Sequence, residues 1–152
     1  MAELKERLRA DLNDAMRARD QVRMRTLRMA LTSITNEEVA GASSRELSDD
    51  EIVRVLTREA KKRREAAEAF GAAGRPDQAE AERAEGVVLA GYLPAQLGDE
   101  ELVGLVTAAI AETGASGMPG MGQVMKTLTP RIAGRADGAR VAAEVRRQLT
   151  AS

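Results

Sequence analysis

Leu47-Ser48-Asp49-Asp50-Glu51-Ile52 opens the clearest helix in this sequence and decides the fold class. Ser48 stands three residues before Glu51, which makes a capping box, and Leu47 and Ile52 bracket it as a hydrophobic staple. The apolar positions that follow recur at helical spacing: Ile52, Val55, Leu56 and Ala60. This pattern predicts a helix that begins after Ser48 and extends towards Phe70.

The same apolar periodicity runs through most of the chain. Helical stripes are predicted in residues 3–18, in the segment after Asp20, after Gly98, from Met121 to Pro130, and after Asp137, which is placed as the N-cap of the last helix. A further helix is predicted from Pro76, which suits a first-turn position, although residues 77–86 are Ala- and Glu-rich and almost free of large apolar side chains. An all-β core is not expected, because the aromatic and β-branched residues that favour strands are scarce here. The sequence therefore predicts a chain that is mainly helical.

A proline marks the predicted division of the chain. Gly91-Tyr92-Leu93-Pro94 ends one helix, because proline restricts the residue before it. The chain restarts at Leu97-Gly98, where Leu97 and Leu102 repeat the staple arrangement. We therefore expect a domain boundary, with a linker at about residues 94–97.

The amino-acid composition limits the chemistry of the chain. Cysteine and histidine are both absent, which excludes disulfides, thiol nucleophiles and thiolate zinc sites, and removes the usual general base near neutral pH. Acidic runs at Asp49-Asp50-Glu51 and Asp99-Glu100-Glu101 are best explained as first helical turns that complement the helix dipole. The sequence predicts no cofactor, no metal and no catalytic residue.

The sequence carries no feature of a membrane or exported protein. Apolar runs are much shorter than the roughly 20 residues of a transmembrane helix. The N-terminal segment is arginine-rich but also carries Glu3, Glu6, Asp11 and Asp14, which argues against a mitochondrial transit peptide. We expect a cytoplasmic protein with no membrane partner.

The C-terminal stretch is basic although the whole chain has a net charge of −1. Its basic residues are Lys126, Arg131, Arg135, Arg140, Arg146 and Arg147, and only Asp137 and Glu144 oppose them. Concentrated positive charge on a small helical unit is typical of a phosphate-binding surface, and Gly134 and Gly138 would let the backbone turn tightly between the helices. A solvated helix face remains an equal alternative on charge alone.

Two further basic segments favour a structural interpretation. Residues 61–64 read Lys-Lys-Arg-Arg, but four consecutive helical residues point around most of the helix and have glutamates nearby. The arginines between Arg17 and Arg28 have Asp11, Asp14 and Asp20 as available partners. We interpret both as solvated helix faces.

Several short motifs together resemble the YqeY-like family over essentially the whole chain. They are Leu27-Arg28-Met29, Asn36-Glu37-Glu38, Lys62-Arg63-Arg64-Glu65, Ala69-Phe70 with Gly74-Arg75, Tyr92-Leu93-Pro94-Ala95-Gln96-Leu97, Met121-Gly122-Gln123-Val124-Met125 and Gly134-Arg135-Ala136-Asp137-Gly138. The C-terminal part also resembles the tail domain of the B subunit of aminoacyl-tRNA amidotransferases. The resemblance implies an all-α protein, with an N-terminal multi-helix bundle over residues 1–93 and a small C-terminal three-helix domain over residues 98–152.

The tail domain of the amidotransferase is understood to contact tRNA while other domains perform the chemistry. Carried over by position, its motif covers Gly122, Gln123, Lys126, Gly134 and Arg135. The family often has lysine where this chain has Gln123, and an acidic or polar residue where it has Gly120. The first departure removes one expected positive charge.

Three functions follow from these observations. The first is a stand-alone module that binds tRNA, or associates with tRNA amidotransferase, through Lys126 and the arginines, with an affinity that falls with salt. The second is a helical protein–protein adaptor that docks on an aminoacyl-tRNA synthetase or amidotransferase. The third is a small amide-transfer enzyme, since the resemblance carries a carbon–nitrogen ligase activity with glutamine as amide donor. The relative's kinase and amidase parts have no counterpart in this chain.

Overall fold

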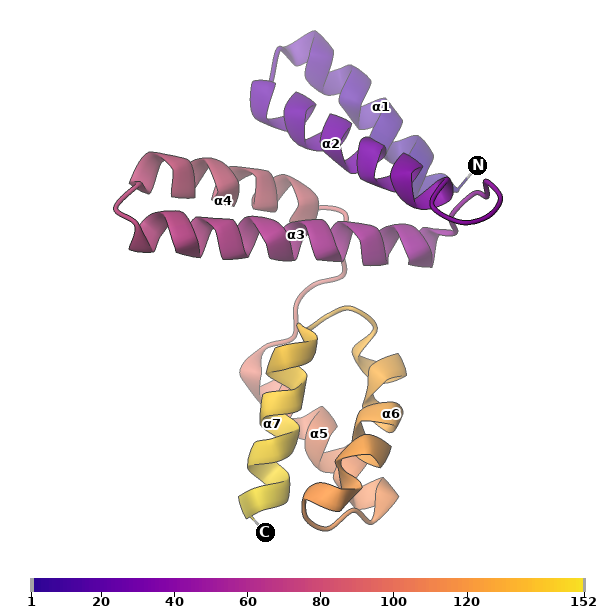
Figure 1. Cartoon of the computed structure of the whole chain (residues 1–152), viewed down its shortest axis with the longest axis vertical. Coiled ribbons are helices and arrows are strands. Elements are labelled where there is room, and N and C mark those ends of the chain that lie inside the picture. The colour runs from indigo at the N-terminus through magenta and orange to yellow at the C-terminus, as the bar shows by residue number, and fades with distance from the viewer. Residues whose placement is uncertain (1, 152) are drawn as a thin grey trace. The chain divides into compact units, whose positions relative to one another are not determined.

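The structure, a computed structural model, describes residues 2–151, and within this range every regular element is a helix (Figure 1). The all-α prediction is therefore confirmed. The chain divides into two compact units, Met1–Leu93 and Pro94–Ser152, which are described separately below.

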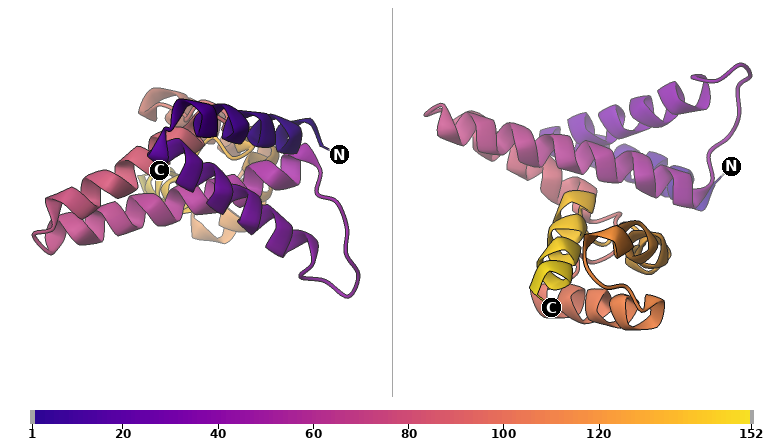
Figure 2. Two further views of the ribbon diagram at one scale, coloured as in Figure 1. Left: turned by 90° about the horizontal axis from the view of Figure 1, so that it is seen from above. Right: turned by 60° about the horizontal axis from the view of Figure 1, so that its bottom comes forward.

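The first unit consists of two antiparallel helix pairs. Its elements are α1 (Glu3–Ala18), α2 (Gln21–Glu38), α3 (Asp49–Ala72) and α4 (Pro76–Ala90). As Figures 1 and 2 show, α1 runs beside α2 and the long helix α3 runs beside α4. All four helices contribute to one core, which contains Leu8, Ala15, Leu27, Ala30, Ile34, Leu47, Ile52, Val55, Leu56 and Leu89.

The start of α3 confirms the capping box. The Ser48 hydroxyl accepts a hydrogen bond from the Glu51 N–H, and the Glu51 carboxylate accepts one from the Ser48 N–H. Leu47 and Ile52 are both buried, as the staple predicts. The N-terminus of α3 is therefore held by contacts between residues that are close in the sequence.

Arg63, within the basic run 61–64, holds α3 against α4. Its guanidinium contacts Glu59 on its own helix at 3.2 Å and Glu85 on α4 at 3.1 Å. Glu85 also accepts a hydrogen bond from Arg25 of α2 at 2.8 Å. Lys61 and Lys62 are exposed and lie near Glu65 and Glu59. In this run Arg63 thus belongs to an ion-pair network between helices, whereas Lys61 and Lys62 lie on the exposed side of α3.

The second unit packs three helices around a separate core. Its elements are α5 (Asp99–Thr113), the 3₁₀ turn η1 (Met118–Gly120), α6 (Met121–Ile132) and α7 (Gly138–Ala151). Val106, Val124, Leu128 and Val145 are fully buried at its centre. Leu97 and Leu102 are also buried, so the second staple holds the entry to α5 in place.

The expectation that the short helix ends at Pro130 is wrong by two residues. α6 continues to Ile132, with Pro130 in its last turn. Proline there removes a single backbone donor, and the turn is still closed because the Ala133 N–H donates to the Thr129 carbonyl at 3.2 Å. The burial of Ile132 in the core favours the longer helix.

Candidate nucleic-acid interface

The residues expected to bind RNA all lie in the second unit, on three consecutive segments. Gly122, Gln123, Lys126 and Arg131 belong to α6, Gly134 and Arg135 to the turn after it, and Arg140, Arg146 and Arg147 to α7. Since α6 and α7 pack against each other, the fold gathers these segments in one small unit.

The turn between α6 and α7 depends on two left-handed residues. Ala133 has φ 47° and Gly134 has φ 78°, and the Arg135 N–H then donates back to the Ile132 carbonyl at 2.9 Å. Glycine suits the second of these positions because it adopts positive φ without steric cost. Gly138 does not have positive φ. The turn therefore requires the positive φ that Gly134 adopts, whereas Gly138 has a backbone conformation that other residues could also adopt.

Asp137 caps the N-terminus of α7. Its side-chain oxygen accepts a hydrogen bond from the Ala139 N–H at 3.1 Å, and its carbonyl accepts one from the Val141 N–H at 3.0 Å. These contacts satisfy donors that the first turn of a helix otherwise leaves unpaired. Asp137 thus has a structural role within the motif.

Arg135 and Arg140 hold the segment that precedes α5. Arg135 Nε donates to the Ala95 carbonyl at 2.9 Å, and Arg140 Nη1 donates to the Leu97 carbonyl at 2.8 Å. The Leu97 N–H donates to the Arg135 carbonyl at 2.8 Å. Both side chains therefore have a structural function that their sequence positions did not predict.

Carboxylates neutralise four of the predicted arginines. Three of these pairs reach to α5, and they join Arg131 to Glu112, Arg135 to Glu101 and Arg140 to Asp99. The fourth pair lies within α7 and joins Arg147 to Glu144, which lowers the pKa of Glu144. Residues 94–152 contain six basic and six acidic side chains, so the unit carries no net charge. The basic character of residues 120–152 is a property of the sequence stretch and not of the folded unit.

Two of the predicted cations have no carboxylate partner within residues 2–151. Lys126 of α6 and Arg146 of α7 are exposed and form no ion pair in this part of the chain. On α6, Gly122 and Gln123 are also exposed and lie one turn before Lys126. These three residues, Gly122, Gln123 and Lys126, form what we call the α6 face.

Gly122 is not required by the packing of the unit. A Cβ atom built at Gly122 meets no other heavy atom within 4 Å, and the residue does not have positive φ. Gly120 is different, because a Cβ there would lie 2.6 Å from the Cβ of Ala115. The glycine at position 120 is therefore explained by internal packing, whereas the glycine at position 122 leaves open space above the helix backbone.

A small cavity lies beside the α6–α7 turn. Its volume is about 160 Å³, and it is lined by Met125, Thr129, Ile132, Gly134, Ala136, Gly138 and Val141. The lining is mainly apolar, and the Thr129 hydroxyl already donates to the Met125 carbonyl at 2.8 Å. The cavity suits a small apolar group and offers no ionisable side chain.

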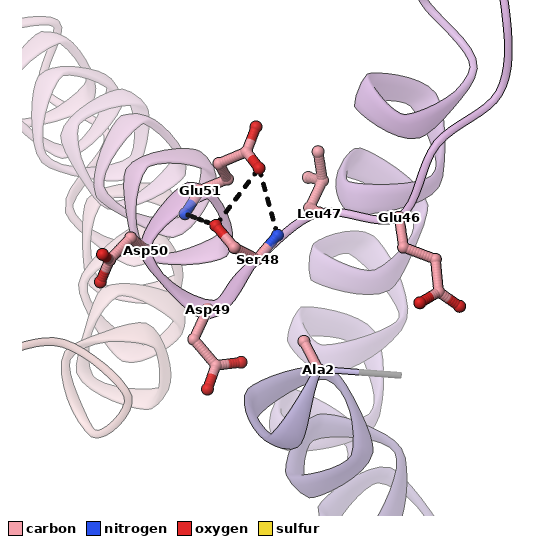
Figure 3. A pocket seen from close by; sticks show the side chains of 7 residues that line it. All are labelled: Ala2, Glu46, Leu47, Ser48, Asp49, Asp50 and Glu51. Carbon is pink, nitrogen blue, oxygen red and sulfur yellow. Dashed lines mark hydrogen bonds between the residues drawn. The ribbon is translucent and has the colours of Figure 1, made fainter.

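A second hollow, in the first unit, lies where the N-termini of α1 and α3 meet (Figure 3). It is lined by Ala2, Glu46, Leu47, Ser48, Asp49, Asp50 and Glu51. Asp49 accepts a hydrogen bond from the Leu4 N–H at 3.0 Å, so it caps α1 while lying in the first turn of α3. Arg45 and Ser48 lower the pKa of Glu51 to about 2.

Asp49 and Glu51 thus satisfy donors at two helix N-termini, and Glu51 also pairs with Arg45, as the helix-dipole interpretation of this acidic run predicts. In the described part of the chain, acidic side chains do not form any group of three that is arranged to hold a metal ion.

Comparison with known proteins identifies a family. The family model described as Yqey-like protein matches residues 5–149. A comparison with curated proteins gives no match. Among the described residues, no helix is both long enough and apolar enough to span a membrane.

Proposed function

The chain belongs to the YqeY-like family, and from that premise we propose that it is a tRNA-binding accessory module that contacts RNA through the α6 face. The observation that carries this proposal is the exposed glycine at position 122, with the unpaired Lys126 one turn later. The choice of tRNA among RNAs is supported by the resemblance to the amidotransferase tail domain. In this role the chain would assist amidotransferase chemistry or tRNA handling without carrying catalytic domains.

Physical chemistry supports a close contact at Gly122. A glycine in a helix costs stability relative to alanine, and at Gly122, as at Gly104 of α5, no internal contact repays that cost. Gly122 differs from Gly104 because an exposed lysine, Lys126, lies one turn after it. The missing side chain exposes the helix backbone to a partner of the size of a sugar–phosphate chain. Lys126 supplies a flexible positive charge, and the Gln123 amide supplies a donor and an acceptor beside it.

The ion pairs of the unit determine how this contact responds to salt. If all six basic residues met phosphates, the affinity would fall very steeply with salt. With four arginines paired to carboxylates, the available cations are Lys126 and Arg146. Two phosphate contacts correspond to a slope of about −1.5 to −2 in a plot of log affinity against log salt. Recognition would then rest on shape and sugar contacts as well as on charge.

Binding of the purified chain to bulk tRNA tests the proposal directly. Affinity is measured at low and moderate salt, with an unstructured RNA of equal length for comparison. We expect tighter, salt-dependent binding to tRNA, and a loss of affinity in Lys126→Glu. The control is Arg54→Glu, which makes the same charge change at an exposed position of α3. Equal binding to both RNAs, or equal effects of the two variants, would contradict the proposal.

One observation favours the adaptor as a second candidate. Val87 of α4 is 73% exposed, next to the Ala- and Glu-rich segment that could present a protein-binding surface. Isolated exposed apolar residues are common on proteins, so this argument is weaker than the one for α6. A pull-down of purified amidotransferase with this chain, after nuclease treatment and at high salt, tests the adaptor. Binding by the wild-type chain that is lost in Val87→Glu would favour it.

A further inference from the structure

Arg135 and Arg140 make the same two kinds of contact. Each guanidinium holds a backbone carbonyl of the segment before α5 with one nitrogen, and contacts a carboxylate of the first turn of α5 with another. Arg135 Nη2 lies 3.3 Å from Glu101 Oε2, and Arg140 Nη2 lies 2.7 Å from Asp99 Oδ1. Both guanidinium groups therefore find all four of these partners within residues 95–101.

The two kinds of contact differ in how easily an external anion can replace them. The carbonyl contacts belong to the backbone arrangement that also includes the Leu97 N–H bond to the Arg135 carbonyl. The carboxylates are on the surface, since the side chain of Asp99 is 95% exposed and that of Glu101 is 62% exposed. Exposed ion pairs contribute little free energy, so water and ions compete with them readily.

A phosphate fits the position of these carboxylates. Guanidinium groups bind phosphate oxygens with the same planar geometry that they use for carboxylates, and the phosphate carries more oxygen acceptors. The two arginines keep their orientation when the carboxylates leave, because their carbonyl contacts remain. The guanidinium groups are therefore arranged for an anion before one binds.

We propose that Arg135 and Arg140 form a phosphate-binding site that Asp99 and Glu101 mask. This inference deepens the proposed function, since in that role the site would take one more backbone phosphate of the same RNA, beyond those that Lys126 and Arg146 contact. Each carboxylate is an internal competitor for one guanidinium, and phosphate binding displaces it. Competition from Asp99 and Glu101 lowers the affinity of the site for single small anions. A polyphosphate can still bind, because it contacts both arginines at once.

Tripolyphosphate is the probe for this site, and binding is followed through the NMR signals of the Arg135 and Arg140 Nε–Hε groups. Asp99→Asn frees Arg140 and Glu101→Gln frees Arg135, while both amides keep an oxygen acceptor and the size of the side chain. The matched control is Glu100→Gln, which removes one charge from the same helical turn. Glu100 makes no ion pair in the described part of the chain.

We expect Asp99→Asn and Glu101→Gln each to raise the tripolyphosphate affinity about fivefold, which corresponds to one close charge pair in water. Each variant should increase the signal change at its own arginine, and Glu100→Gln should change the affinity less than about twofold. An equal rise of the tripolyphosphate affinity in Glu100→Gln would show that only the net charge matters, and it would overturn the proposal that Asp99 and Glu101 mask the site. No rise in Asp99→Asn or Glu101→Gln would overturn it as well.

The outcome is separable from that of the proposed function. Lys126→Glu tests tRNA binding through the α6 face and does not touch the carboxylates of α5. If tRNA does not bind but the two unmasking variants bind tripolyphosphate more tightly, the RNA proposal fails and the masked site stands. If Lys126→Glu lowers tRNA binding and the variants Asp99→Asn and Glu101→Gln behave like Glu100→Gln, the RNA proposal stands and the masked site fails.

Discussion

Gly120 and Ala115 are so close that a Cβ atom on residue 120 would lie 2.6 Å from the Ala115 Cβ and 3.2 Å from its Cα. Real Cβ atoms do not approach each other so closely, and the atoms in conflict belong to the rigid part of the chain. We therefore expect Gly120→Ala to lower the free energy of unfolding by about 1–3 kcal/mol, as overpacked cores do.

Urea denaturation of the purified chain measures this effect. The control is Gly104→Ala in α5, where an added Cβ meets nothing within 4 Å. That variant should leave stability unchanged or raise it by about 0.4–1 kcal/mol. Gly120→Ala as stable as the wild type would show that the η1 turn moves away from Ala115 at little cost.

Lys5 and Glu38 form an ion pair in which both side chains are almost inaccessible. Lys5 Nζ lies 2.8 Å from Glu38 Oε1, and the Leu47 N–H donates to the same carboxylate. We expect Lys5→Met to destabilise the protein by about 2–4 kcal/mol, because it leaves a shielded carboxylate without its cation. The double variant Lys5→Met/Glu38→Leu should recover part of this loss, which a double-mutant cycle measures.

The Lys5–Glu38 pair also predicts a pH dependence. The hydrogen bond from Lys5 holds the pKa of Glu38 below its ordinary value of 4.5. Its contribution is therefore fully present above pH 4.5 and is lost as the pH falls below that value. Glu51 and Glu144 also have lowered pKa values, so the wild-type protein loses stability from them in the same pH range. The contribution of Glu38 is isolated by comparing the wild type with Lys5→Met, whose free energy of unfolding should fall less on acidification. Parallel curves for the two proteins would contradict this assignment.

Tyr92 allows a direct spectroscopic test, because it is the single tyrosine of a chain without tryptophan. Its hydroxyl donates to Asp11 at 2.5 Å, and burial together with this bond raises its pKa to about 12. Near-ultraviolet absorbance should show ionisation at about 12 in the native protein, and a lower midpoint in Asp11→Asn. Stability should decline as the pH rises from about 10 towards about 12, since the unfolded chain ionises first. A native midpoint near 10 would contradict the contact.

The outer ends of α3 and α4 should be the least stable part of the first unit. Among the described residues 64–84, the buried side chains are Ala67 and Ala79, which are small and make few contacts. Residues 52–60 instead carry Ile52, Val55 and Leu56 in the core. Native-state hydrogen exchange should therefore be faster in residues 66–80 than in residues 52–60. Equal protection would mean that the α3–α4 pair opens as one unit.

Features fixed by neighbouring residues were predictable from the sequence. The capping box at Ser48 and Glu51, the two leucine staples and the Asp137 cap involve residues two to five positions apart. Their geometry follows from helix stereochemistry alone, so a pattern in the sequence is sufficient. The end of α6 was less predictable, because the burial of Ile132 outweighs the local effect of Pro130.

The candidate site was predictable in its residues but not in its charge. Arg135 lies 34 positions from Glu101, and Arg140 lies 41 positions from Asp99. Charge counted along the stretch 120–152 cannot include partners that only the fold brings near. The open space above Gly122 is likewise a property of the packed unit, and no residue pattern distinguishes it from the tightly packed Gly120.

RNA is proposed to approach the helix backbone at Gly122, and two glycine variants test this contact. Gly122→Gln and Gly104→Gln place the same uncharged side chain at two exposed helical glycines, both with open space around the position of the Cβ. Both should raise the free energy of unfolding by about 0.5 kcal/mol, since glutamine is the better helix former. We expect Gly122→Gln to bind tRNA at least about fivefold more weakly, a loss of about 1 kcal/mol, and Gly104→Gln to bind like the wild type. Unchanged tRNA affinity in Gly122→Gln, or an equal loss in both variants, would contradict the proposed contact.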